Sequence, residues 1–417
     1  MKLLSSLLLL LCLTLLCAQG TSSDLQSLRL KVAQNPIDAE SRLSLAYQLM
    51  LSGNSAEALK HYETLLKQDP EHAQAMEGSL WALQVQERYQ KSVERARAFL
   101  KHSPEHSSIL SYQAYGLSQL GLHLAARARY ARAELLARDD AARQSAKLGL
   151  AWEYIYLQDH PSAMAMLDSS QDPQAMEFLN KARLKLSLGA STNYDGLNSG
   201  TLTVALHKAQ WGLAASYEEL LLDGSRFRKK LGATVDWQNP VANLKASVNT
   251  LSGRDKRVYP AVLYSLSMQP IFYLDQLLVK PSLTGHYGSY HRFDIQQADL
   301  GLQISGDRLS GGYSFSTLYQ DNDALDSDTQ EQLHSANLGI KAYKDAWLRA
   351  YLYLGEAAWW TNPYGVVYDD FETKNTVYGL SISSPIGKKM GILIYSQIGT
   401  HNDETDFSSA LTLSYSM

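Results

Sequence analysis

The sequence predicts an α+β chain in two parts, an N-terminal α-solenoid of helix pairs followed by an antiparallel transmembrane β-barrel of about 14 strands. Three observations support this prediction. Prolines recur every 34 residues, at Pro36, Pro70 and Pro104, which is a period of stacked helix pairs. From about Leu184 onward, apolar residues alternate with polar ones, as in strands with one apolar face. The chain has 25 tyrosines against 8 phenylalanines, and such amphipathic rings suit the boundary between lipid and water.

Residues 1–20 are expected to be a signal peptide. Lys2 precedes the apolar run 3–16, and Ala18-Gln19-Gly20 has the small-x-small pattern of a cleavage site. The alternative is a lipoprotein signal acylated at Cys17, although leucine stands just before it, where such signals carry a small residue. Cys12 and Cys17 are the only two cysteines, so neither a disulfide framework nor a cysteine-based zinc site is expected.

Residues 21–182 are expected to form a helical repeat domain. Glycine turns recur at Gly53 and Gly121, and small or aromatic positions recur at Ala58 and Tyr62, Ser92 and Ala96, and Ala126 and Tyr130. One helix pair cannot bury its apolar face alone, so stacked neighbours are needed. This pattern resembles the tetratricopeptide repeat family over about residues 24–180. It departs from the family at Arg138, where a repeat-ending proline would stand.

The resemblance implies a concave groove lined by the ninth position of each repeat. Those positions hold Tyr47, Trp81, Tyr115 and Trp152. Flat, rigid rings bind sugars or extended peptides with little loss of conformational entropy. The alternative is that these rings only pack between neighbouring first helices.

Residues 183–417 are expected to form the barrel. The alternation is clear in the outward set Leu202, Val204 and Leu206 and in the last strand, which carries Phe407, Leu411, Leu413 and Tyr415 on one face. Short connections, such as Gly306-Asp307, alternate with expected longer ones, such as Asp223–Phe227 and His401–Asp406, as in outer-membrane barrels. The alternative is a soluble β-sandwich or a lipocalin-like barrel. An even strand number would place both barrel ends, and hence the repeats, in the periplasm.

The faces of the strands predict which side chains meet lipid and which meet the lumen. Lys245, Ser247 and Asn249 are expected to point inward. The interfacial girdles are expected to contain Trp211, Trp237, Trp347, Tyr264 and Tyr353.

Two predicted outside loops carry candidate binding residues. Asp321, Asp323, Asp326 and Asp328 could hold Ca²⁺, but their spacing does not fit an EF-hand loop, so a solvated acidic loop is expected and no metal is assigned. Trp359, Trp360, Tyr364 and Tyr368 share another loop. They could stack on a sugar or a surface partner, or lie in the upper girdle.

Catalytic motifs are sparse. His286, His291 and His334 stand among serines and aspartates of the barrel, and a catalytic triad is recognised by geometry rather than by order. No G-x-S-x-G elbow, phosphate-binding glycine loop or H-E-x-x-H is present. The expectation is therefore a protein that is not an enzyme and has no cofactor.

The whole architecture is similar to the outer-membrane components of exopolysaccharide export and to the repeat-plus-barrel proteins that move lipoproteins to the cell surface. The resemblance implies a Gram-negative outer-membrane transport component, with lipid and a periplasmic protein or polysaccharide as partners. The alternatives are a structural protein with a plugged barrel and a barrel-embedded hydrolase. A net charge of -4 excludes a basic protein that coats nucleic acid.

Overall fold

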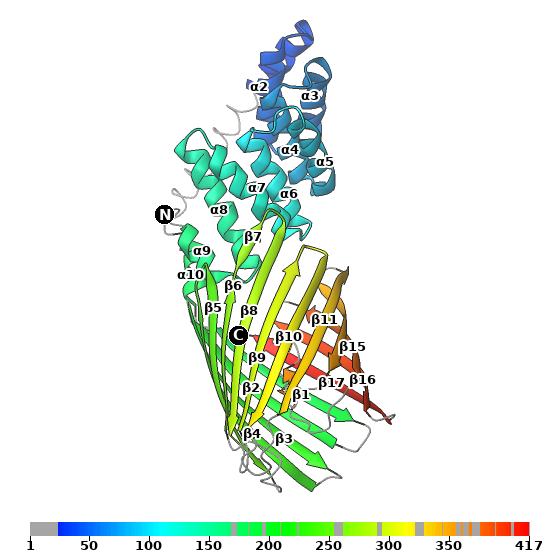
Figure 1. Ribbon diagram of the computed structural model, residues 1–417. Helices are drawn as coiled ribbons and strands as arrows, with labels where there is room; N and C mark the ends of the chain where they lie inside the picture. Colours follow the sequence, from blue (N-terminus) through cyan, green and yellow to red (C-terminus); the bar gives the residue numbers. More distant parts are fainter. Residues whose placement is uncertain are drawn as a thin grey trace, which may run out of the picture. The chain divides into compact units, whose positions relative to one another are not determined.

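The computed structural model describes residues 24–167, 173–181, 183–193, 197–208, 210–222, 225–253, 262–289, 294–321, 329–343, 345–355, 360–361, 367–368, 376–387, 389–401 and 404–416. The expected signal peptide, both cysteines and His291 lie outside the described residues. The chain divides into two compact units, Met1–Glu153 and Tyr154–Met417 (Figure 1).

The first unit is built from antiparallel helix pairs. A helix over 24–34 precedes α2 (Ala39–Leu51), α3 (Ser55–Gln68), α4 (Ala73–Val85), α5 (Tyr89–Leu100), α6 (Ser107–Gln119), α7 (His123–Leu136) and α8 (Asp140–Tyr156). The second unit begins at the end of α8 and includes α9 (His160–Leu167) and α10 (Pro173–Asn180). Within the described part of the chain, no helix has both the length and the apolar character needed to cross a membrane.

The turn inside each helix pair uses a left-handed residue at the repeat spacing. Gly53 and Gly121 have φ of 82° and 71°, and Glu87 and Gln158 take the equivalent places with φ of 57° and 61°. Glycine adopts this conformation without a steric penalty, so the predicted glycine turns are present. The second and fourth repeats make the same turn with ordinary side chains, which is why the glycine signal was visible in only half of them.

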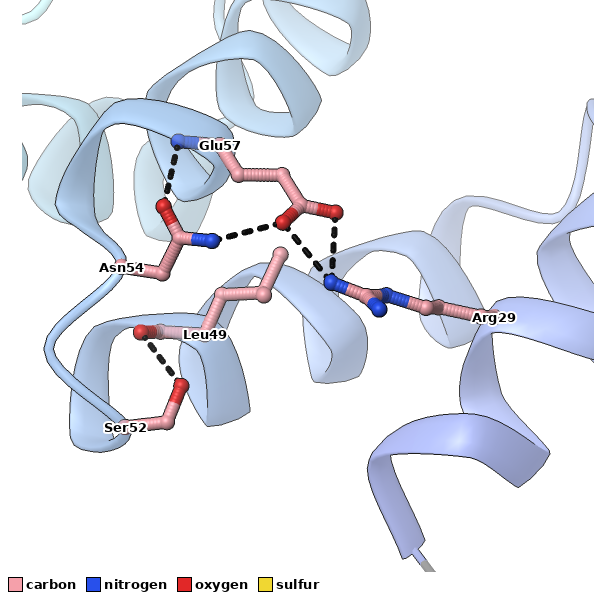
Figure 2. Close-up of polar contacts among 5 residues, drawn as sticks. All are labelled: Arg29, Leu49, Ser52, Asn54 and Glu57. Carbon is pink, nitrogen blue, oxygen red and sulfur yellow. Dashed lines mark hydrogen bonds and ion pairs between the residues drawn. The ribbon is translucent and has the colours of Figure 1, made fainter. Parts of the chain in front are cut away.

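The first of these turns is fixed by side chains (Figure 2). Asn54 caps α3 by accepting the Glu57 backbone N–H at 3.3 Å, and its amide donates to the Glu57 carboxylate at 2.7 Å. Arg29 from the helix over 24–34 donates to both oxygens of the same carboxylate, at 3.0 and 2.8 Å. Ser52 ends α2 by donating to the Leu49 carbonyl at 3.0 Å. Capping groups of this kind satisfy backbone groups that a helix end leaves unpaired.

Repeat interfaces are filled by one aromatic ring facing one small residue. The Tyr62 ring lies where a Cβ at Gly78 would stand, and Tyr130 does the same at Gly149. Between them the arrangement is reversed: Ala96 occupies the place of Tyr62, Tyr112 occupies the place of Gly78, and both belong to one apolar cluster. Each interface therefore holds one aromatic ring, as close packing requires. The ring comes from the second helix of one repeat in the first and third interfaces, and from the first helix of the next repeat in the second interface.

The second unit is dominated by one closed antiparallel sheet. Its strands are β1 (Arg183–Asn193), β2 (Leu197–Lys208), β3 (Trp211–Leu222), β4 (Ser225–Gln238), β5 (Ala242–Gly253), β6 (Val262–Pro270), β7 (Phe272–Leu274), β8 (Leu277–Ser289), β9 (Asp294–Ser305), β10 (Leu309–Asp321), β11 (Thr329–Tyr343), β12 (Ala346–Gly355), β15 (Thr376–Ile386), β16 (Met390–His401) and β17 (Glu404–Ser416). A separate pair, β13 (Trp360–Thr361) and β14 (Val367–Tyr368), lies in the connection between β12 and β15.

Closure is made by β1 pairing with β17, in register at Leu188 and Leu413. β6 and β7 both pair with β8 and act as one strand interrupted after Pro270. Among the described residues the ring therefore contains fourteen strands. The predicted α+β class and strand number are confirmed.

Two of the connections that were expected to be longer are short. β4 already begins at Ser225 and β17 at Glu404, so the links 223–224 and 402–403 are no longer than the short turns. The polar residues expected in loops there continue the ladder instead: Arg226 pairs with Leu221, and Thr405 pairs with Thr400. Strand ends that extend beyond lipid need no apolar face, so polarity alone did not mark the end of pairing.

The two faces of the barrel wall differ in chemistry. Gln303 of β9 and Asn337 of β11 meet over Gly312 of the strand between them, at 3.5 Å. Side chains of second-neighbour strands converge only on the concave face, so this polar face is the inside. The alternate residues of each strand point to the opposite face, where exposed aliphatic side chains such as Leu300 and Leu302 lie. An apolar outer face around a polar interior is the architecture of a barrel that spans a membrane.

The girdle prediction was partly wrong. Trp211 and Trp237 form an outer-face pair at the short-turn end, with ring centroids 6.4 Å apart. Tyr264 stacks on Tyr287 across the strands, also at 6.4 Å. Trp347 and Tyr353 have the inner parity of β12, where Tyr353 is buried in a cluster with Tyr351 and Tyr395. A period of two shows that they share a face but does not say which face.

Candidate functional site

The predicted aromatic column lies on the first helix of successive repeats. Tyr47 is on α2, Trp81 on α4, Tyr115 on α6 and Trp152 on α8. The Tyr47 and Trp81 rings are neighbours, with centroids 6.1 Å apart and planes at 50°. Tyr47 and Tyr115 are 51% and 42% exposed, so these rings offer free surface. Trp81 also packs against the apolar core of the first repeats, which limits its rotation.

A hollow of about 580 Å³ lies beside this column, among the first helices of the second to fourth repeats. Trp81 and Tyr115 belong to its lining together with Glu77, Gln84, Ser108 and Ser111. Tyr47 and Trp152 are not lining residues. The structure therefore brings two of the four predicted residues into one concave site and leaves the other two further along the same column.

Hydrogen bonds to neighbouring groups hold the polar side chains of the hollow in place. The Gln84 amide donates to the Tyr112 carbonyl at 2.7 Å and to Ser92 at 3.2 Å. Ser108 donates to the Glu77 carboxylate. Burial, and then the Glu77 charge, raise the pKa of Tyr112, so this phenol stays neutral. The groove thus presents preorganised polar groups beside rigid rings, which lowers the entropy cost of binding.

The charge of the hollow restricts its ligand. Among the described residues that line it, Glu77 is the only carboxylate and there is no lysine or arginine. The rest of the polar lining consists of hydroxyls and one amide, including Ser107 and Ser145. A polyanion would meet a carboxylate and no cation here. An uncharged chain can stack on the rings and exchange hydrogen bonds with the hydroxyls.

The predicted loop aromatics lie only partly within the described residues. Trp359 and Tyr364 lie outside the described residues, as do Asp323, Asp326 and Asp328. The backbones of Trp360 and Tyr368 pair in the short hairpin of β13 and β14. Among the described residues, no group of three or more histidine, cysteine, aspartate or glutamate side chains is arranged to hold a metal.

A second site, which the sequence did not point to, joins α9 to the short-turn end of the barrel. Asp159 caps α9 by accepting the Ser162 N–H at 3.2 Å. Its other oxygen accepts the hydroxyl of Tyr273 on β7 at 2.8 Å. His160 contacts Arg183, the first residue of β1. We call Asp159, His160, Arg183 and Tyr273 the α9 latch.

The latch reaches two distant parts of the barrel wall. In the order of the ring, β1 and β7 are separated by β2, β3, β4 and β5. Five strand spacings of ~4.8 Å correspond to ~24 Å of wall. Two adjacent residues contact both sides, so the start of α9 lies across part of the opening. Burial, followed by the charge of Arg183, lowers the pKa of His160 to about 4, so its ring is neutral when docked.

No family model matches this chain, and no curated protein matches it. Similar solved structures include a thermophilic TPR protein of Thermus thermophilus, 17% identical, with TM-score 0.33, covering 40% of this chain and 90% of that chain. PilF of Pseudomonas aeruginosa is 19% identical, with TM-score 0.33 and coverages of 38% and 71%. A loop-deletion mutant of OmpT, an outer membrane protein of Vibrio cholerae, is 10% identical, with TM-score 0.35 and coverages of 57% and 98%. These are likenesses of fold only.

Proposed function

We propose that this protein is an outer-membrane transport or export component whose repeats hold an uncharged, extended polymer in the groove at Trp81 and Tyr115. The aromatic hollow, whose described lining has one carboxylate and no cation, carries this proposal, because its rigid rings and hydrogen-bonded amide are in place before a ligand arrives. The barrel then passes the cargo or anchors the groove at the membrane. In this proposal the repeats are periplasmic, since an even number of strands leaves both barrel ends on one side.

The binding step is tested with the full chain in detergent micelles by isothermal titration calorimetry. The probes are cellohexaose as a neutral chain, a galacturonic acid hexamer as its acidic counterpart and an uncharged Gly/Ser peptide. The sugar is expected to bind, and the acidic hexamer to bind at least tenfold more weakly. Replacing both Trp81 and Tyr115 with alanine is expected to weaken binding by at least tenfold, about 1.4 kcal/mol.

The matched control for this experiment is Leu135→Ala, which removes a side chain that is 83% exposed on α7 and does not line the hollow. Binding of the peptide alone would reassign the groove to a protein partner. If no neutral probe binds, or if the double alanine variant binds as well as the unaltered chain, the groove has no part in transport.

A structural role is the second candidate, and the α9 latch favours it. A helix start lying across the opening narrows the path through the barrel. Single-channel recording in planar bilayers separates the two roles. Steady conductance, or conductance that appears when the latch is weakened, supports transport. A barrel that stays silent after the latch is broken is an anchor.

A further inference from the structure

We propose that Ser265, His286 and Asp299 on the inner face of the barrel form a nucleophilic triad that hydrolyses carboxylic esters. The three residues come from consecutive strands β6, β8 and β9. Ser265 stands directly opposite His286 in the ladder, and Asp299 lies diagonally across the next strand pair. The inference is independent of what the helical groove binds.

The distances are those of a nucleophile, a base and an orienting carboxylate. Ser265 Oγ lies 2.7 Å from His286 Nδ1, and His286 Nε2 lies 3.0 Å from Asp299 Oδ2. With its proton on Nε2, the neutral ring donates to Asp299 and accepts from the serine through Nδ1. This is the division of roles that makes a serine hydroxyl nucleophilic, with the two ring nitrogens exchanged relative to the protease arrangement.

A further layer of contacts holds the base and the carboxylate. Gln297 donates through Nε2 to Asp299 Oδ1 at 2.7 Å and is itself buried. The His286 side chain is only 12% exposed, so few other orientations are open to it. Ser265 is half-buried. A fixed base beside an accessible hydroxyl is the requirement for covalent catalysis.

The surroundings select the substrate class. Ser265, His286 and Gln297 border a hollow of about 820 Å³, but its apolar side chains Tyr264, Leu266 and Tyr287 have the opposite parity and belong to the outer face. On the inner face the neighbours of Ser265 are the hydroxyls of Ser247 and Ser267, and such a polar wall suits a small polar ester that reaches the lumen through water. Ser267 has the same parity on β6 and accepts the Thr284 hydroxyl at 3.0 Å, so its own proton remains to donate to a carbonyl oxygen on that face. Esters need only water as the second reactant.

The reaction balances without any other reagent. Ser265 Oγ attacks the acyl carbon while its proton passes to His286 Nδ1, and the C–O bond to the alcohol breaks as that proton moves to the leaving oxygen. Water then attacks the acyl-serine and gives a proton to His286. The Ser265–acyl bond breaks, Ser265 Oγ recovers the proton, and a carboxylic acid is released.

The test uses the full chain in detergent micelles with a fluorophosphonate probe and p-nitrophenyl butyrate. Labelling is expected at Ser265 by peptide mass spectrometry, and Ser265→Ala should abolish both labelling and turnover. His286→Gln should slow turnover by about 10²–10⁴-fold. Asp299→Asn should lower kcat while KM changes little, and should shift the pH profile. Ser282→Ala, an inner-face serine of β8, should behave as the unaltered chain.

Folding of each variant is checked by its heat-dependent migration on gels, which reports the closed barrel. If folded, unaltered protein is not labelled at Ser265, the proposal is overturned. It is also overturned if hydrolysis persists in folded Ser265→Ala, or if Asp299→Asn changes stability but neither kcat nor the pH profile.

Discussion

The helical repeats and the barrel wall solve the same packing problem with opposite chemistry. In both, a glycine leaves room for a neighbouring side chain to lie over the backbone. In the repeats that side chain is the ring of Tyr62 over Gly78. In the barrel it is the amide pair of Gln303 and Asn337 over Gly312. Rings fill a dry interface, whereas amides line a polar lumen. At these two positions, the side chain above the glycine matches the surroundings that the surface meets.

The largest effect of a substitution is expected on the stability of the repeats, where the Tyr62 ring fills the repeat interface. Tyr62→Ala should lower the free energy of unfolding of the repeats by about 3–5 kcal/mol, because it opens a cavity. Gly78→Tyr alone should also destabilise them by overpacking. The double variant copies the neighbouring interface of Ala96 and Tyr112, and it should recover most of the loss. Urea unfolding followed by helical circular dichroism measures all three.

If the double variant is no more stable than the worse single one, the two side chains do not share one volume and the alternating arrangement has another cause.

An intermediate effect is expected where a helix meets the polar inner face of the barrel, at the α9 latch. Docked His160 has a pKa lowered to about 4 from 6.5, so protonation favours the undocked form. The latch should therefore hold above pH 6.5, weaken as the pH falls through that value and be lost below about 4. The charges that face His160 are Arg183 and His207. Conductance in planar bilayers should accordingly rise between pH 7 and pH 5.

Tyr273→Phe removes the hydrogen bond to Asp159 and should raise conductance at both pH values. His160→Gln should remove the pH dependence. A channel whose pH response survives His160→Gln would show that another group controls the opening.

The smallest effect is expected on the inner wall of the barrel. A methyl group at Gly312 meets only the flexible ends of Gln303 and Asn337, which can turn into the lumen. Gly312→Ala should therefore change stability by less than about 1 kcal/mol. The matched control is Gly311→Ala on the outer face, where the new Cβ meets its nearest neighbour at an ordinary 3.6 Å. The midpoint of heat-dependent gel migration measures both. A loss as large as that of Tyr62→Ala would end the contrast between the two regions.

Local periodicity predicted most of the fold, because it records which side of an element meets water. The spacing of Pro36, Pro70 and Pro104 indicated the repeats, and the alternation at Leu202, Val204 and Leu206 indicated the strands. The predictions that failed also have a physical cause. Trp347 and Tyr353 share a face, but only closure of the ring shows that it is the inner one.

The sites were less accessible to sequence reasoning because they join distant residues. Trp81 and Tyr115 could be found, since the repeat places them at one spacing. Tyr273 and Asp159 are 114 residues apart and belong to no motif. His286 was noticed, but its partners depend on the strand register, which places Ser265 opposite it. Such sites could be sought in a sequence as polar residues that face the lumen and stand opposite one another on adjacent strands.

The seam between the first and last strands has a consequence for biogenesis. Every other partnership in the main sheet joins strands that follow one another along the chain, so it closes a much shorter loop. Lys185 must wait for Ser416. Contacts at such separation are slow to form because the intervening loop loses much entropy. The unfinished ring has two unpaired edges until the seam forms, and such edges can pair with other chains.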